Sequence, residues 1–95
     1  YVHAMNKEEI QYRLFKELSN KPDLTQREMA NRVNLSLGKL NYCLSELVKK
    51  GFIKVKRFRS SHNKVAYMYI LTPRGLEEKA RVTLCFLRRK MAEYE

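Results

Sequence analysis

The hydrophobic positions in the first part of the chain recur at helical spacing. Ile10, Leu14 and Leu18 are four residues apart, so they share one face of a helix. Asn6 has a side chain suited to the N-cap, where it can accept a hydrogen bond from the first helical turn. The pattern therefore predicts a helix over residues 6–19.

Two further helices are predicted close together. Thr25 and Glu28 form a T-x-x-E capping box, so a second helix begins at Thr25. Asn34 can take the left-handed conformation that ends a helix, and Ser36 can cap a third helix that runs to about Lys50. The apolar stripe of this third helix comprises Leu37, Leu40, Leu44, Leu47 and Val48. Its opposite face carries Gly38, Lys39, Tyr42, Ser45 and Lys49. Two helices joined by so short a turn are typical of a helix-turn-helix, whose second helix presents its outer face to a groove.

After Gly51 the period of the pattern changes from helical spacing to alternation. Ile53 and Val55 alternate with lysines, which predicts a strand with one buried face. A second β-rich run follows at residues 65–71, after a polar stretch at residues 59–64. The two runs predict an antiparallel hairpin, or wing, with a basic tip.

A last helix is predicted from Thr72, which suits the N-cap, and Pro73, which suits the first helical position. One side of it carries an apolar stripe made of Leu76, Ala80, Leu84, Leu87, Met91 and Tyr94. Val82 and Phe86 lie on another side. One small domain can cover only one of these sides, so the other predicts a partner. The predicted partner is a second copy of the chain, and the residues predicted to form the homodimer interface are Ala80, Leu84, Leu87, Met91 and Tyr94.

The charge of the chain is strongly positive and locally concentrated. Lys and Arg number 20 against 10 Asp and Glu, and residues 47–76 contain eight basic side chains and no acidic one. This asymmetry points to a polyanion, with a solvated charged face as the alternative. An anionic membrane surface would need an amphipathic basic helix or a lipidation signal, and neither is evident. Without a spanning helix or a signal peptide, the protein is expected to be cytoplasmic.

The sequence shows no pattern that predicts catalysis or a bound cofactor. It has no hydrolytic triad, phosphate loop or metal-ligand cluster, so we expect neither an enzyme nor a metalloprotein. Cys43 and Cys85 form no disulfide framework, and His3 and His62 do not extend them into a metal site. We expect reduced thiols, with a redox switch on the third helix as the alternative.

Several segments resemble the MarR-type winged helix regulators. They are Leu-Thr-Gln-Arg-Glu at residues 24–28, the third helix at residues 36–51 and Leu-Thr-Pro-Arg-Gly at residues 71–75. Residues 36–44 and 86–95 are most similar to the short MarR-like regulators associated with extracellular-polysaccharide gene clusters. The resemblance implies a transcriptional regulator of such genes that binds double-stranded DNA as a homodimer. A winged-helix module for RNA binding or protein assembly is the alternative.

The fold class predicted from these patterns is mainly α with a small β-hairpin wing, a winged helix-turn-helix with a C-terminal dimerisation helix. Residues 6–75 form the DNA-binding unit, and residues 76–95 form the dimerisation helix of the same globular unit, because 95 residues support one core. Met5 is a plausible natural start, so residues 1–4 are expected to be a foreign extension.

Three groups of residues are expected to contact DNA. The resemblance implies that the recognition helix enters the major groove with Ser36, Gly38, Lys39, Asn41, Tyr42 and Ser45. It also implies contacts to the DNA backbone from the start of the preceding helix, at Thr25, Gln26 and Arg27. The basic wing predicts further contacts from Arg57, Arg59, His62 and Lys64. Asn41 lies at the border of the apolar stripe, so local packing is its alternative role.

Two departures from the larger MarR proteins change what the resemblance implies. Those proteins carry an acidic-x-basic motif at the base of the wing, whereas residues 56–59 read Lys-Arg-Phe-Arg here. Their longer flanking helices form a dimer cleft that binds small aromatic ligands. The short helices predicted here leave little material for such a cleft, so we do not expect this kind of ligand.

Overall fold

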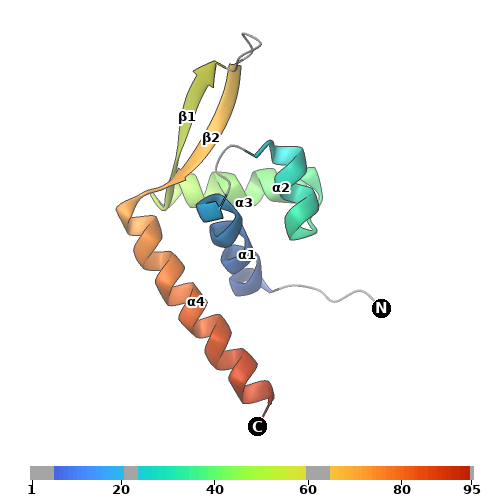
Figure 1. Cartoon of the computed structure of the whole chain (residues 1–95), viewed down its shortest axis with the longest axis vertical. Helices are drawn as coiled ribbons and strands as arrows, with labels where there is room; N and C mark the ends of the chain where they lie inside the picture. Colours follow the sequence, from blue (N-terminus) through green and yellow to red (C-terminus); the bar gives the residue numbers. More distant parts are fainter. Residues whose placement is uncertain (1–5, 21–23, 60–64, 95) are drawn as a thin grey trace.

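The structure, a computed structural model, describes residues 6–20, 24–59 and 65–94. Its elements in chain order are α1 (Lys7–Asn20), α2 (Gln26–Val33), α3 (Leu37–Lys49), β1 (Ile53–Arg59), β2 (Val65–Leu71) and α4 (Pro73–Glu93). The first three helices cluster, the β1–β2 hairpin projects from one side of the cluster, and α4 extends the other way (Figure 1). The predicted fold class, mainly helical with a small antiparallel hairpin, is confirmed. The expected start at Met5 and the extension at residues 1–4 lie outside the described ranges.

The local signals that predict the helix ends are present in the structure. Asn6, Thr25, Ser36 and Thr72 each accept a hydrogen bond through their side-chain oxygen from the backbone N–H three residues later. Asn34 adopts φ 60° and ψ 45°, the left-handed conformation that ends α2. These caps satisfy backbone donors and acceptors that a helix cannot satisfy itself, so they determine where each helix begins or ends.

The hydrophobic core lies between the three clustered helices and the bases of the hairpin and α4. The stripe predicted for α3 is buried at Leu40, Leu44 and Leu47, which are at most 2% exposed. Leu37 and Val48 were predicted in the same stripe, but they are 45% and 38% exposed. The prediction was wrong for these two because they lie at the edge of a narrow core-facing arc on a helix whose other sides face solvent.

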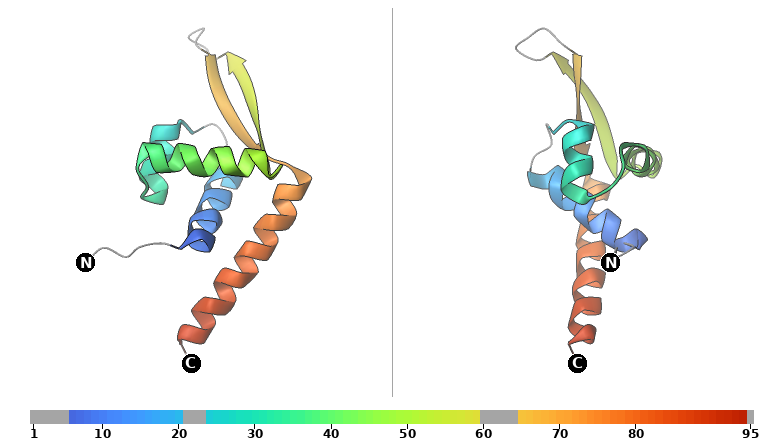
Figure 2. Two further views of the ribbon diagram at one scale, coloured as in Figure 1. Left: turned by 180° about the vertical axis from the view of Figure 1, so that it is seen from behind. Right: turned by 90° about the vertical axis from the view of Figure 1, so that its right-hand side faces the viewer.

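Alternation along β1 does not predict burial beyond its first residue. The strands pair in antiparallel register as predicted, with Ile53 opposite Leu71 and Val55 opposite Tyr69. Ile53 is 2% exposed, but Val55 is 42% exposed, which contradicts the expected buried face. At this level β2 is the strand that is covered, since Tyr69 opposite Val55 is 8% exposed, and beyond it the hairpin rises past the helical cluster (Figure 2).

The turns that lead into β1 and out of β2 are joined to each other. The backbone N–H of Thr72 donates to the carbonyl oxygen of Phe52 at 3.0 Å, and the Thr72 hydroxyl donates to the carbonyl oxygen of Gly51. Gly51 ends α3 with a positive φ of 78°. A Cβ on Gly75 would overlap the carbonyl oxygen of Phe52, so only glycine allows α4 to begin this close to the turn.

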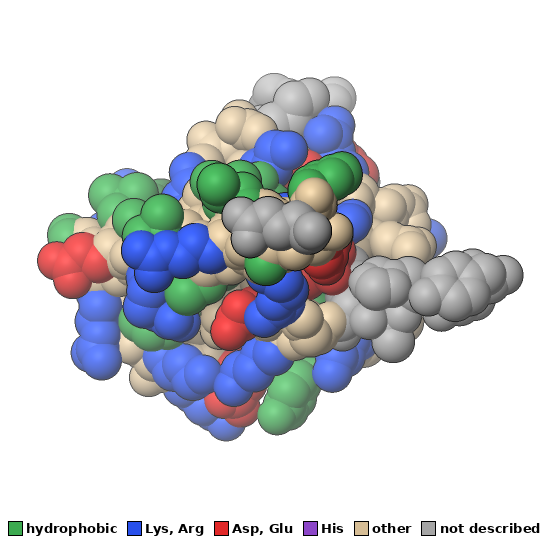
Figure 3. Space-filling view, turned by 90° about the horizontal axis from the view of Figure 1, so that it is seen from below, with side chains coloured by type: hydrophobic (Ala, Val, Ile, Leu, Met, Phe, Trp, Pro, Cys, Tyr) green, Lys and Arg blue, Asp and Glu red, His purple; other side chains and the backbone are tan. Residues whose placement is uncertain are grey.

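One side of α4 packs along α1 in antiparallel direction. The contacts that show this direction are Lys79 with Ser19, Phe86 with Tyr12, and Arg89 with Glu8. The rings of the middle pair are stacked with their centroids 4.3 Å apart, and Val82 beside them is 1% exposed. The predicted second side of α4, which includes Leu84, Leu87 and Met91, is exposed. In the view from below, hydrophobic side chains lie at the surface among lysines and arginines (Figure 3).

Within the described ranges, none of the helices combines the length and the apolar character needed to cross a membrane.

Candidate nucleic-acid interface

The outer face of α3 is a polar surface carried on a buried anchor. Leu40 and Leu44 hold the helix against the core and are 0% and 1% exposed. The residues that the resemblance assigned to the major groove are all exposed on the other sides: Ser36, Gly38, Lys39, Asn41, Tyr42 and Ser45. The exposure of Asn41 argues against its alternative role in packing. In the left view of Figure 2, α3 lies in front of the helical cluster and no other element crosses it.

A cavity of about 330 Å³ opens between α1 and α3. Some of the residues predicted to contact bases line this cavity, and others do not. Its lining comprises Lys7, Ile10, Gln11, Leu14, Lys39, Tyr42, Cys43, Glu46, Leu47 and Lys50. The Lys39 ammonium lies 5.6 Å from the centroid of the Tyr42 ring, so these two form one surface beside the cavity. Gly38 and Ser45 do not line it and lie farther round the helix. Lys39 and Tyr42 therefore both lie on the flank of α3 nearer to α1.

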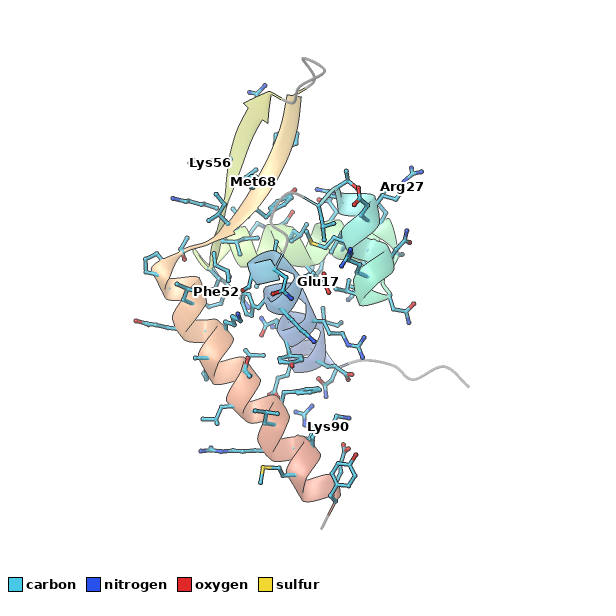
Figure 4. The ribbon with its side chains drawn as sticks, in the orientation of Figure 1. Glu17, Arg27, Phe52, Lys56, Met68 and Lys90 are labelled. Atoms are coloured by element: carbon cyan, nitrogen blue, oxygen red, sulfur yellow. The ribbon has the colours of Figure 1, made fainter. Side chains whose placement is uncertain are left out.

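The start of α2 carries three residues that were predicted to contact the DNA backbone, and the structure gives them different surroundings. Thr25 and Arg27 are exposed, and Arg27 points away from the helical cluster (Figure 4). Gln26 is half-buried, and its Nε2 donates a hydrogen bond of 2.6 Å to the hydroxyl of Tyr69 in β2. Arg27 is thus free to meet a phosphate at the helix N-terminus. The exposed hydroxyl of Thr25 caps α2 and donates to the Glu28 carboxylate, and the amide of Gln26 contacts the hairpin.

The hairpin presents cations on both of its faces. Because side chains alternate along a strand, Lys54 and Lys56 share one face of β1 and Arg57 lies on the other, and all three are exposed. Figure 4 shows Lys56 directed away from the helical cluster. The predicted contacts at His62 and Lys64 lie outside the described residues, as does the side chain of Arg59. The sequence prediction named neither lysine as a contact, although both belong to its acid-free run.

Two acidic side chains lie at this surface, Glu28 beside Thr25 and Glu46 beside Lys49 of α3, while others pair with cations elsewhere. On α4, Glu78 accepts two hydrogen bonds of 2.8 Å from Arg81. These bonds, and the charges of Arg81 and Lys50, hold the pKa of Glu78 below its ordinary value although partial burial opposes the shift. The same bonds raise the pKa of the Arg81 guanidinium. On α1, Glu17 lies 3.5 Å from Arg32 of α2.

A known family matches the segment that contains α1, α2, α3 and the start of β1. Its description is winged helix-turn-helix DNA-binding, and it covers residues 7–54, about half of the 95 residues. The chain belongs to the winged helix-turn-helix DNA-binding family. The match ends at the second residue of β1, so this winged-helix protein adds most of its hairpin and all of α4 outside the matched segment.

Solved structures of transcriptional regulators have a similar fold. The PcaV regulator from Streptomyces coelicolor, in complex with its natural ligand, is 24% identical with a TM-score of 0.70, covering 86% of this chain and 57% of PcaV. A MarR family regulator from Silicibacter pomeroyi is 22% identical with a TM-score of 0.64, covering 87% and 54% of the two chains. A MepR mutant from S. aureus is 18% identical with a TM-score of 0.69, covering 95% and 64%.

At these identities the similarity establishes the fold, and it agrees with the MarR resemblance in the sequence. This winged-helix protein spans less than two thirds of the length of each of these regulators. No curated protein matches its sequence significantly.

Proposed function

We propose that this winged-helix protein is a transcriptional regulator that binds specific double-stranded DNA sequences as a homodimer. The observation that carries the proposal is the exposed polar face of α3 beside an acid-free hairpin with exposed cations, in a chain of a DNA-binding family. A helix of this shape fits the major groove, and a cationic ribbon beside it suits the flanking phosphates. The role needs neither catalysis nor a metal or cofactor.

The two parts of the surface have different proposed tasks. Lys39, Asn41, Tyr42 and Ser45 meet base edges in the major groove, where ammonium groups, side-chain amides and hydroxyls can distinguish base pairs. Thr25 and Arg27 contact the phosphate backbone at the N-terminus of α2. In the wing, Arg57 joins the predicted Arg59, His62 and Lys64 in contacts that depend little on sequence, and we add Lys54 and Lys56 to that group.

The homodimer is proposed from the exposed stripe on α4. Leu84, Leu87 and Met91 are 50%, 49% and 66% exposed, and together with Ala80 and Tyr94 they form one continuous side of the helix. The opposite side is already covered by α1, so a second copy of α4 is the simplest cover for this stripe. A two-fold pair of reading helices would recognise a palindromic site with half-sites about one helical turn apart.

The dimer is tested by replacing Leu87 and Met91 together with Glu. Leu87 is 49% exposed and Met91 is 66% exposed, so the variant should keep its fold, while two buried charges per copy would oppose association. Analytical ultracentrifugation at tens of micromolar, a concentration at which a specific dimer associates, should show a dimer for the unmodified protein and a monomer for the variant. A monomeric unmodified protein contradicts this part of the proposal.

Extracellular-polysaccharide genes are the proposed targets, and this step rests on the resemblance of residues 36–44 and 86–95. A regulator of chromosomal genes acts where the chromosome is, so the cytoplasm is the proposed location. Sequencing the genomic fragments that the protein retains should recover promoters of such gene clusters. If the retained fragments contain no such promoter, the proposed target genes are wrong, while the proposal that the protein binds DNA still holds.

RNA binding is the competing function, because a winged helix by itself does not determine its partner. Selection of bound duplexes from a random pool tests both functions together. DNA regulation predicts a palindromic motif whose affinity falls steeply with salt, while excess RNA or single-stranded DNA competes weakly. Retention of single strands or RNA in preference to every duplex would favour the competing function.

A further inference from the structure

The hairpin is attached to the helical cluster at few points. Ile53 at its base is buried, but Val55, Arg57 and Tyr67 farther along the same face are exposed. Tyr69 lies opposite Val55 on the same face of the hairpin. Unlike the other three, it is buried, with 8% of its surface exposed. Among the hairpin residues beyond the base whose side chains the structure describes, 54–57 and 67–70, Tyr69 is the one buried side chain. Its contacts therefore decide how the hairpin is held.

The hydroxyl of Tyr69 accepts a hydrogen bond of 2.6 Å from Nε2 of Gln26, a residue 43 positions earlier in the chain. Gln26 is the first residue of α2, next to the N-cap Thr25. Among the residues whose side chains the structure describes, this is the one side-chain hydrogen bond between the clustered helices and the hairpin strands. It joins the helix-turn-helix directly to the wing.

The directional character of this bond matters more than its strength. Antiparallel pairing with β1 determines the shape of the hairpin, but it does not determine the angle at which the hairpin leaves the cluster. A two-stranded ribbon twists and bends readily by itself. Packing of the Tyr69 ring restricts this motion, and the hydrogen bond adds a preferred geometry because it weakens when distance or angle departs from its optimum.

We propose that Gln26 and Tyr69 are positioning residues that hold the wing at a fixed direction relative to α3, so that both elements reach DNA together. The inference rests on the proposed DNA-binding function. Two contact elements on one stiff frame bind with a high effective concentration, because the second contact forms within a complex that already exists. Loss of the hydrogen bond between Gln26 and Tyr69 removes no side chain of the wing or of α3 that contacts DNA. It lowers the effective concentration with which the second of these two elements reaches DNA once the first is bound. Gln26 then acts through Tyr69, which differs from the backbone contact predicted from the sequence.

The direction of the wing is measured first in the free protein. Cysteines replace Asn31 on α2 and Lys56 on β1, both of which are exposed, and carry spin labels for pulsed dipolar spectroscopy. The two native cysteines, Cys43 and Cys85, are replaced by Ala so that only the introduced sites are labelled. The distribution of distances between the labels reports the spread of hairpin directions.

The variant that removes the bond is Tyr69→Phe, which keeps the buried ring and loses only the hydroxyl. Its distance distribution should be broader than that of the parent, while Tyr12→Phe, which alters a tyrosine on the side of α1 that faces α4, should leave the distribution unchanged. If Tyr69→Phe fails to fold, Gln26→Met removes the same bond from the other partner. An unchanged distribution in the folded variant overturns the proposal, whether or not the protein binds DNA.

DNA binding supplies a second, independent measurement. Arg57→Ala is introduced into the unmodified protein and into Tyr69→Phe, and the loss of affinity for a selected duplex is compared. If the wing is held in place by the bond, the loss should be smaller in Tyr69→Phe by at least about threefold, which is a measurable coupling between neighbouring sites. Equal losses in the two backgrounds contradict the proposal. Absence of duplex binding by the unmodified protein would contradict the proposed function, and the label distances would still decide the role of the bond.

Discussion

The reading helix α3 and the wing present polar and cationic side chains to the same proposed partner, but they are held in different ways. α3 is fixed by Leu40, Leu44 and Leu47, all nearly inaccessible to solvent, whereas the wing beyond its base contributes Tyr69 as its buried side chain in the described residues. The helix is therefore stiff and the wing is held by few contacts. Reading of base edges needs the extensive packing of α3, because base contacts tolerate little displacement. Phosphates are spaced alike along every sequence, so a wing that is oriented by few contacts is sufficient to meet them.

The difference in attachment predicts very different costs for removing apolar side chains. Leu44→Ala should lower the free energy of unfolding by about 2–5 kcal/mol, because it leaves a cavity in the core. Val55→Ala should cost no more than about 1 kcal/mol, because Val55 is 42% exposed on the wing. Urea titration followed by circular dichroism measures both. Equal costs would mean that the wing is as well packed as α3, which would remove the basis of the comparison.

The junction where the hairpin meets α4 is expected to tolerate an added side-chain carbon less well than the exposed surface of α3 does. Gly75→Ala should lower the free energy of unfolding by about 1–3 kcal/mol, because the new Cβ would meet the backbone carbonyl of Phe52 and force the junction apart. Gly38→Ala is the matched control, because nothing lies within 4 Å of a Cβ at that position on α3. It should be neutral or stabilising by up to about 1 kcal/mol. Thermal unfolding of the two variants side by side compares these effects, and a destabilised control would mean that α3 is less open than described.

Substitutions of exposed residues distinguish contacts that recognise the base sequence from contacts that bind any DNA through its phosphates. Tyr42→Ala should reduce affinity for a selected operator by about 5-fold to 150-fold and affinity for a scrambled duplex much less, if the ring contacts bases. Its melting temperature should hardly change, because Tyr42 is 61% exposed. Arg57→Ala should weaken binding to both duplexes alike and reduce the salt slope by about one unit for each lost phosphate contact.

Fluorescence anisotropy titrations at several salt concentrations measure both variants with both duplexes. Lys39→Ala extends the series, because Lys39 lies beside Tyr42 on α3 and should likewise reduce affinity for the operator more than affinity for the scrambled duplex. Equal losses on operator and scrambled DNA for Tyr42→Ala would remove this residue from base reading. Loss of operator binding alone for Arg57→Ala would mean that the wing also reads sequence.

The smallest expected effect is a pH dependence on α4, outside both regions. The pKa of Glu78 is held below its ordinary value of 4.5, chiefly by hydrogen bonds from Arg81. A carboxyl with a lowered pKa in the folded state stabilises the protein above that ordinary value, and the contribution is lost as pH falls through the folded pKa. Glu78→Gln should therefore be slightly less stable than the unmodified protein near pH 7, with the difference shrinking as pH falls below the ordinary pKa of 4.5 and through the lower folded pKa. The effect is small because solvent screens the pair. Denaturant titrations at a series of pH values test it, and a difference that grows on acidification would reverse the assignment.

Much of the fold could be predicted because its determinants are local in the sequence. The caps at Asn6, Thr25, Ser36 and Thr72 each use a side chain and a backbone N–H three residues away. Such contacts form within one turn, so they can be identified without knowing the tertiary structure. The exposure of Val55 could not be predicted, because it depends on which strand of the hairpin the helical cluster covers, and Tyr69 opposite Val55 on β2 is the buried partner. Alternation indicates which residues share a face, and it does not say whether another element covers that face.

The candidate site was predictable to a similar extent. Exposure of the polar face of α3 follows from helical periodicity, which places it opposite the leucines that are buried. The contact between Gln26 and Tyr69 could not be predicted, because 43 residues separate the two and nothing in their spacing indicates that they meet. The same lack of a local signal explains why Gln26 was grouped with Thr25 and Arg27. Lys54 and Lys56 belong to the acid-free segment that is evident in the sequence. Strand alternation places them on the face opposite Arg57, but it does not indicate which face of the hairpin contacts DNA.

The antiparallel packing of α4 on α1 has a mechanical consequence. A helix of 21 residues is about 32 Å long, so α4 acts as a lever arm that begins at the junction beside the wing. A swing of about 10° at that end would move the far end by about 5 Å, more than the 3.4 Å step between base pairs. The stacking of Phe86 on Tyr12 and the ion pair of Arg89 with Glu8 hold the arm along most of its length. If two copies pair through α4, these contacts far from the DNA set the tolerance with which the two reading helices are spaced.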